Sequence, residues 1–130
     1  MIGDRGGYAE AVEHLQAAIQ IEPDSAPSRY NLAVMLTALD RPDEAIEQYR
    51  LAAQLDPTDV DVLNNLGFLL VRAGEADAAV QTLRRAIQLR PDAAGPHFNL
   101  GRALAQLGLE QEALASLRRA AELDPRYGSP

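Results

Sequence analysis

The chain lacks cysteine and lysine altogether, and only six of its 130 residues are aromatic. Without cysteine it can form neither a disulfide nor a thiolate metal site. All 12 basic residues are arginine and stand against 19 acidic residues, which gives a net charge of −7. That sign is wrong for a module that binds the nucleic-acid backbone, so the composition argues against a nucleic-acid partner.

Long apolar runs are missing as well. The longest run without a polar side chain is Leu66–Val71, whereas a bilayer crossing needs roughly 20 residues. The chain begins Met-Ile-Gly-Asp-Arg-Gly-Gly, which lacks the apolar core of a signal peptide. These features predict no insertion into a membrane and favour a cytoplasmic location without fixing the compartment.

The most informative feature that is present is a repeat of 34 residues. Proline recurs at this interval and closes a similar phrase each time, at Pro23, Pro57, Pro91 and Pro125. A unit this short cannot bury its own apolar side, so consecutive units must stack. Alanine and leucine dominate the apolar residues, and runs of the strand-favouring Val, Ile and Thr are absent. The sequence therefore predicts an all-α fold.

Alignment of the units on their prolines shows columns of apolar residues at helical spacing. One column is alanine throughout, the next is leucine or tyrosine four residues later, and the third is again alanine. The three columns are Ala11, Ala45, Ala79 and Ala113; Leu15, Tyr49, Leu83 and Leu117; and Ala18, Ala52, Ala86 and Ala120. Offsets of four and three residues place these side chains on one stripe of a helix, which we predict to be the second helix of each unit.

The first helix of each complete unit has a small residue directly after a recurring leucine, and we expect the two helices of the unit to cross there. This column holds Ala33, Gly67 and Gly101. A further column, predicted to form the turn between the two helices, holds Gly6, Asp40, Gly74 and Gly108. Together the columns predict seven helices, at roughly 9–21, 28–39, 43–55, 60–73, 77–89, 96–107 and 111–123.

These columns resemble the tetratricopeptide repeat (TPR) family, whose pattern is W-x2-L-G-x2-Y, then A-x3-F, then a closing proline. The tryptophan column departs from that pattern and holds Arg29, Leu63 and His97. The resemblance implies a single array over residues 1–130, a right-handed α-solenoid of antiparallel helix pairs. Its parts would be a half repeat containing only a second helix, three full repeats and the start of a further unit, at 1–25, 26–59, 60–93, 94–127 and 128–130.

The pattern begins and stops within a repeat, so we expect part of a longer array, or an array that borrows its caps from another chain. One hypothesis is a homo-oligomer formed through these open ends, which are expected to expose apolar side chains. The residues concerned are Leu15 and Ile19 at one end and Leu114 and Leu117 at the other. A different hypothesis is the targeting array of a larger enzyme.

In the TPR family the first helices line a concave face that binds partners. Here one column of the first helices is asparagine in every complete unit, at Asn31, Asn65 and Asn99. Carboxamides can bond the backbone of an extended peptide whatever its side chains, and this column resembles the asparagine ladder in the TPR region of O-GlcNAc transferase. Rings and arginines nearby would anchor partner side chains. The neighbouring candidates are Tyr30, Asn64, Phe68, Arg72, Phe98 and Arg102.

A purely structural role is open for the same residues, because asparagine also bonds neighbouring helices and phenylalanine packs between repeats. We nevertheless predict a scaffold that binds a protein or peptide, either as an extended segment or as a helix, in an amphipathic concave groove. Replacement of the three asparagines by alanine is expected to weaken binding and to leave folding intact.

No catalytic, cofactor or metal site is predicted. His14 and His97 have no partner at metal-ligand spacing, so we expect surface or packing roles for both. The arginine pairs 84–85 and 118–119 recur on second helices, where a solvated outer face is favoured over a site for an acidic partner. The sequence thus indicates an interaction protein and not an enzyme.

Overall fold

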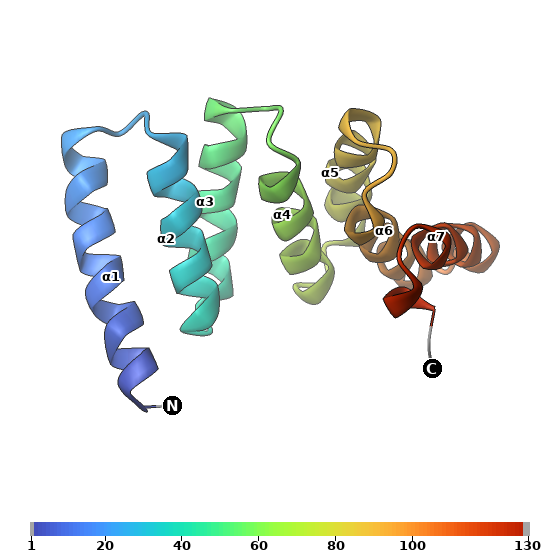
Figure 1. Ribbon diagram of the computed structural model, residues 1–130, viewed down its shortest axis with the longest axis horizontal. Helices are drawn as coiled ribbons and strands as arrows, with labels where there is room; N and C mark the ends of the chain where they lie inside the picture. The colour runs from blue at the N-terminus through green and yellow to red at the C-terminus, as the bar shows by residue number, and fades with distance from the viewer. Residues whose placement is uncertain (1, 129–130) are drawn as a thin grey trace. The chain divides into compact units, whose positions relative to one another are not determined.

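The computed structural model describes residues 2–128, with side chains placed for residues 6–128. This part of the chain forms seven α-helices and no strand, followed by a short 3-10 segment (Figure 1). The predictions of an all-α fold and of seven helices are confirmed. The elements are α1 (Ile2–Ile21), α2 (Ala26–Ala38), α3 (Pro42–Leu55), α4 (Val60–Arg72), α5 (Ala76–Leu89), α6 (Ala94–Gln106), α7 (Glu110–Leu123) and η1 (Pro125–Tyr127).

The chain divides into two compact units, Met1–Pro57 with α1 to α3 and Thr58–Pro130 with α4 to α7. We call them unit 1 and unit 2. The sequence predicts one continuous array, and the division falls close to the boundary between its expected repeats 26–59 and 60–93. Repeats contact mainly their neighbours along the chain, so a boundary between repeats is where such an array divides most easily.

Two helices that come first in their repeats, α2 and α4, are capped at their N-termini by a side chain. Ser25 precedes α2, and its hydroxyl accepts a hydrogen bond from the backbone N–H of Ser28 at 3.2 Å. Asp59 precedes α4, and its carboxylate accepts from the N–H groups of Asp61 and Val62 at 3.0 and 3.3 Å. Such caps satisfy backbone donors that have no partner within the helix. They start α2 and α4 at or within two residues of the predicted positions.

Three of the four predicted turn residues adopt the left-handed conformation. The φ angles of Asp40, Gly74 and Gly108 are 58°, 80° and 79°, which confirms this column as the turn between first and second helices. The prediction for Gly6 is wrong, because this residue lies inside α1, which begins at Ile2 and not near residue 9. The φ angle of Gly6 lies outside the left-handed range, as its place within a helix requires.

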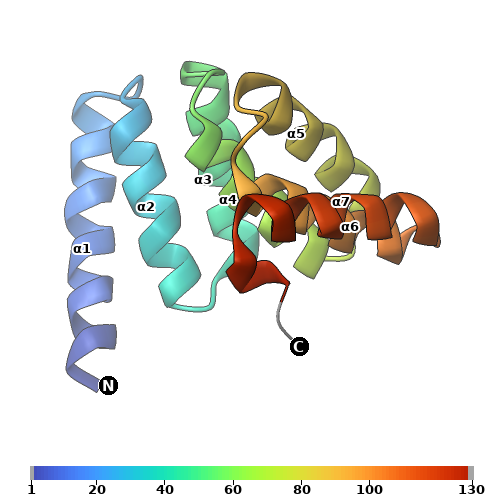
Figure 2. The same cartoon turned by 45° about the vertical axis from the view of Figure 1, so that its right-hand side comes forward.

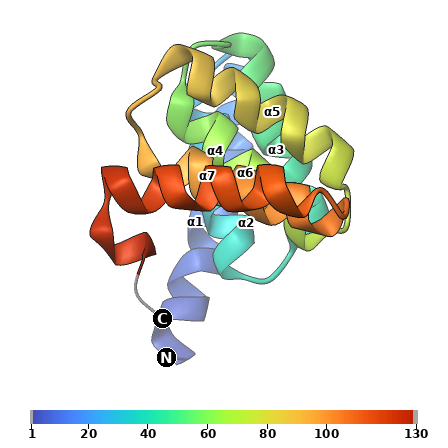
Figure 3. The same ribbon diagram turned by 90° about the vertical axis from the view of Figure 1, so that its right-hand side faces the viewer.

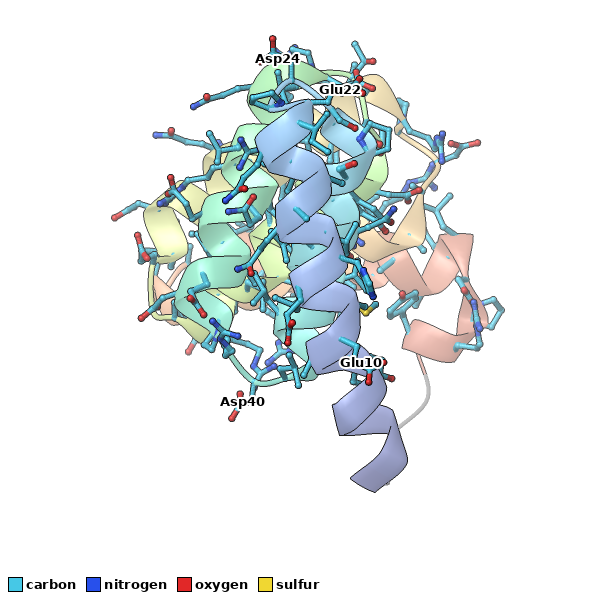
Figure 4. The ribbon with its side chains drawn as sticks, turned by 90° about the vertical axis from the view of Figure 1, so that its left-hand side faces the viewer. Glu10, Glu22, Asp24 and Asp40 are labelled. Atoms are coloured by element: carbon cyan, nitrogen blue, oxygen red, sulfur yellow. The ribbon has the colours of Figure 1, made fainter. Side chains whose placement is uncertain are left out.

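The negative charge is concentrated in unit 1. Its four arginines against ten acidic residues give −6, whereas eight arginines against nine acidic residues give −1 in unit 2. Figure 4 shows Glu22 and Asp24 where α1 passes into α2, with Glu10 and Asp40 toward the other end of unit 1. An acidic partner therefore meets much less repulsion from unit 2 than from unit 1.

The predicted crossing points are present in unit 2. A Cβ atom on Gly67 would lie 2.5 Å from Cγ and Cδ2 of Leu83, and one on Gly101 would lie 2.7 Å from the same atoms of Leu117. A leucine of the second helix thus occupies the space that a side chain at each glycine would fill. Leu83 is fully buried, whereas Leu117 is only half-buried.

Gly67→Ala should lower the free energy of unfolding by up to about 2 kcal/mol, because overpacking costs about 1–3 kcal/mol and the better helix propensity of alanine returns only about 1 kcal/mol. Urea unfolding followed by circular dichroism measures the change. Gly7→Ala is the matched control, since nothing lies within 4 Å of a Cβ at this helical glycine. Equal effects of the two substitutions would contradict the role of Gly67 as a crossing point.

Candidate functional site

The first helices of unit 2, α4 and α6, carry most of the predicted site residues. Asn64, Phe68 and Arg72 follow one another at four-residue spacing and lie along one side of α4. Phe98 and Arg102 have the same spacing on α6. We use the name α4–α6 surface for the side chains of Asn64, Asn65, Phe68, Arg72, Phe98, Asn99 and Arg102.

Two of its asparagines bond each other. Asn99 is only 8% exposed, and its Nδ2 donates to Oδ1 of Asn64 at 2.8 Å. A Cβ atom on Gly95 would lie 2.9 Å from Nδ2 of Asn64, so the absent side chain at position 95 makes room for this carboxamide. For Asn99 this geometry favours the structural alternative, in which the asparagine column bonds a neighbouring helix.

A second polar bridge joins the same helices near their other ends. Nε2 of Gln106 donates to the backbone carbonyl oxygen of Val71 at 2.7 Å. The carbonyl belongs to the last turn of α4 and also accepts from the backbone N–H of Gly74 at 3.1 Å. With the Asn99–Asn64 bond, this interaction fixes the position of α6 against α4 at two points along their length.

A ring and a guanidinium group stack on the α4 part of this surface. The guanidinium carbon of Arg72 lies 5.6 Å from the centroid of the Phe68 ring, within the range of a cation–π interaction. Phe68 is half-buried and Arg72 is exposed. Arg102, also exposed, occupies on α6 the repeat position that Phe68 occupies on α4. Arg72 is therefore accessible beside a partly accessible ring, and Arg102 is accessible on α6.

The ring of Phe98 is partly covered by Tyr127. The two ring centroids are 4.8 Å apart at an interplanar angle of 36°. Tyr127 ends η1, which turns back from the end of α7 (Figure 2). Tyr127 lies beyond the last helical pattern of the sequence and is therefore not among the predicted site residues; its place two residues after the closing Pro125 is the only signal for it.

An ion pair holds η1 in place. Asp124 accepts from the backbone N–H of Arg126 at 3.0 Å, and its Oδ2 lies 2.6 Å from Nη2 of the same arginine. These hydrogen bonds lower the pKa of the Asp124 carboxyl below its ordinary value. The segment that positions Tyr127 on Phe98 is therefore organised by its own local charges.

In unit 1 the ring of Tyr30 packs edge-on against Tyr49 of α3, with centroids 5.9 Å apart. Tyr30 thus contacts the second helix of its own repeat, while Asn31 beside it is exposed. Asn31 belongs to unit 1, whereas Asn65 and Asn99 belong to unit 2. A continuous ladder of the three asparagines stays a prediction.

The terminal helices expose part of the predicted apolar surface. Leu114 is 50% exposed and lines, with the half-buried Leu117, a groove of about 280 Å³ between α6 and α7. On α1, Leu15 is half-buried, but Ile19 is only 9% exposed, so the expected exposure of Ile19 is wrong. Instead Ala18 is exposed, although alanine in this column is fully buried in every other second helix.

Two residues of the tryptophan column tie their first helices, α2 and α6, to the loop before them. Nε2 of His97 lies 2.9 Å from the carbonyl oxygen of Pro91, and Nε and Nη2 of Arg29 each donate to the carbonyl of Pro23 at 3.3 Å.

His14 is exposed on α1. The described residues contain no group of three or more metal-ligating side chains. Among the helices within residues 2–128, none combines the length and apolar character that a membrane crossing requires.

Asn99→Ala should lower the free energy of unfolding by about 1–3 kcal/mol, because it leaves Oδ1 of Asn64 without its donor in a partly buried place. This outcome departs from the expectation that all three asparagines can be replaced without loss of stability. Asn31→Ala, the same change at an exposed position, should alter stability by less than about 0.5 kcal/mol. Urea titrations compare the two, and equal stabilities would show that the Asn99–Asn64 bond contributes nothing.

Comparison with known proteins agrees with this architecture. Models of the tetratricopeptide repeat match residues 4–63, 36–88 and 94–127, and a model described as TPR repeat matches residues 69–108. No curated protein sequence matches the chain significantly. Among solved structures, a crystal structure of MamA has a TM-score of 0.89 at 22% identity, covering 94% of this chain and 71% of its own.

Two further structures show the same fold. MamA from Desulfovibrio magneticus RS-1, from residue 41 to its end, has a TM-score of 0.87 at 20% identity, with coverage of 95% of this chain and 72% of its own. YrrB, described as a TPR protein with an unusual peptide-binding site, has a TM-score of 0.85 at 23% identity, with coverage of 92% and 62%. With family models matching most of its length, the chain belongs to the tetratricopeptide repeat family, a fold that serves protein interaction.

Proposed function

We propose that this chain is a non-catalytic scaffold that binds an extended peptide on the α4–α6 surface. The observation that carries the proposal is the pairing of an accessible ring with accessible arginines, Phe68 with Arg72 at 5.6 Å and Arg102 at the equivalent position of α6. Aromatic and arginine side chains supply most of the binding free energy in protein interfaces. Here an aromatic ring, Phe68, and an arginine, Arg72, stack on each other on α4.

The chemistry of this surface selects the peptide. The named side chains are neutral or positively charged, so the guanidinium groups of Arg72 and Arg102 favour a peptide that carries a carboxylate. The rings of Phe68 and Phe98 favour an apolar side chain beside it. Asn65 would bond the peptide backbone, whereas the role of Asn99 is to hold Asn64 in place.

The peptide-binding site ascribed to YrrB supports this proposal at the level of the fold, because a protein of similar architecture is described as having such a site. The TPR family models support it in the same way. The residues that would contact the peptide are argued from this chain alone.

The double substitution Phe68→Ala and Arg102→Ala should weaken peptide binding at least about tenfold, since it removes one ring and one guanidinium group from the surface. Peptides for the measurement come from a random library selected against the unaltered protein. Their dissociation constants are then determined by isothermal titration calorimetry with both proteins.

Arg118→Ala serves as the control, because it removes an exposed arginine from α7 without touching the α4–α6 surface. It should leave the affinity unchanged. The proposal is wrong if the double variant, folded by circular dichroism, binds the selected peptides as tightly as the unaltered protein does.

A second candidate function is self-association through the terminal helices. The observation in its favour is the accessible apolar surface at both ends, with Ala18 exposed on α1 and Leu114 half-exposed beside the groove that Leu117 lines. The equivalent alanines of α3, α5 and α7 are fully buried. A helix from a second copy of the chain could cover Ala18, the member of this column on α1.

Light scattering across a wide concentration range tests this candidate. Self-association predicts a mass that rises with concentration and a Leu114→Glu variant that stays a monomer, because a carboxylate cannot be buried in an apolar contact without a partner. A monomer at every concentration would rule it out, while the peptide-binding proposal would stand.

A further inference from the structure

A second groove lies in unit 2, on the side formed by the second helices. It runs between α5 and α7, which both face the viewer in Figure 3 with α6 partly hidden behind α7, and its volume is about 410 Å³. We call it the outer groove. Its lining consists of Arg84, Ile87 and Gln88 from α5, His97 and Leu100 from α6, and Ala115, Ser116 and Arg119 from α7.

The lining combines positive charge at the walls with an apolar interior. Arg84 and Arg119 come from opposite walls, and no acidic residue lines the groove. Ile87, Leu100 and Ala115 supply the apolar part. In a chain with a net charge of −7, the charged residues that line this groove are both arginines.

Both arginines are available to a ligand. Nη2 of Arg84 lies 3.7 Å from Oε1 of Glu112, and Nη1 of Arg119 lies 3.2 Å from Oε1 of Glu122. All four side chains are at least half exposed. Exposed pairs of this kind contribute about 0–1 kcal/mol, so a ligand carboxylate can replace either partner at little cost.

The imidazole of His97 is fixed by the loop beneath it. Because a carbonyl oxygen only accepts hydrogen bonds, Nε2 must donate to Pro91, and in the neutral ring Nδ1 is then an acceptor. The loop carbonyl thereby holds the ring as part of the wall next to Leu100. The groove thus has two cations, a fixed imidazole and an apolar floor in one place.

We infer that the outer groove binds an acidic peptide segment in which a glutamate or aspartate stands next to an aliphatic residue. The carboxylate meets Arg84 or Arg119, and the aliphatic side chain packs on Ile87 and Leu100. The volume of the groove is within the range of small-molecule sites, which suffices for a few side chains but not for a folded domain. The inference is independent of the α4–α6 surface, since the two share no residue.

The probe is an acetylated and amidated peptide of repeated Ser-Leu-Glu units, with a Ser-Leu-Gln counterpart as its uncharged match. Titration into isotopically labelled protein, followed by backbone amide NMR shifts, should give saturable changes at Ile87, Leu100 and Ser116 with the acidic peptide. Charge reversal by Arg84→Glu and Arg119→Glu should weaken this binding about tenfold or more.

The matched control is the reversal of the two adjacent arginines, Arg85→Glu and Arg118→Glu. It changes the net charge equally on the same two helices but spares the groove lining, and it should preserve most of the affinity. Equal losses from both double variants would show a non-specific charge effect and overturn the inference.

Three further results would also overturn it. They are shifts confined to Asn65, Phe68 and Arg102, equal binding of the uncharged peptide, and no saturable shift up to about 1 mM peptide. The first of these would leave the proposed peptide-binding function intact. Conversely, outer-groove shifts that persist in the Phe68→Ala and Arg102→Ala variant would support the outer groove even if the α4–α6 surface bound nothing.

Discussion

The close approach of the two helices within each repeat determines which side chains unit 2 exposes to a partner. Leu83 and Leu117 occupy the space that side chains at Gly67 and Gly101 would fill, and this contact fixes the rotation of each helix about its axis. Once Gly67 faces α5, helical geometry turns Asn65 and Arg72 away from α5 and places Phe68 about 100° around the helix from Gly67. The accessible ring and cations are thus a consequence of where the smallest residue stands.

The same contact accounts for the outer groove. Second helices pack on first helices at the glycine column, so α5 and α7 lie over α6 with His97 and Leu100 between them. The walls of the outer groove then carry the charged residues that lie beside the buried side chains of α5 and α7. In unit 2 these residues are Arg84 and Arg119, and the net charge of −1 for this unit reflects the eight arginines it contains.

Periodicity in the sequence predicted the helices, the turns and the crossing points, because these depend on spacing along one chain segment. Asp40, Gly74 and Gly108 are examples, each recognisable from its column. Gly6 shares that column but lies within α1, so a glycine in this column does not by itself form the turn.

The partners of individual side chains could not be read in this way. The Asn99–Asn64 bond joins residues 35 positions apart that belong to different columns, and it depends on the space that Gly95 leaves. The Phe98–Tyr127 contact depends on a segment outside any helical pattern. Columns show which side of a helix a residue occupies, whereas bonds between helices depend on side-chain directions that only the packed structure fixes.

One helix takes part in both surfaces of unit 2. His97 and Leu100 of α6 line the outer groove, while Phe98, Asn99 and Arg102 of the same two turns belong to the α4–α6 surface. The bonds of Asn99 and Gln106 to α4 resist any sliding of this helix. A displacement or stiffening of α6 on one side is therefore transmitted to the other within a single helix diameter, and two partners bound there at once would be energetically coupled.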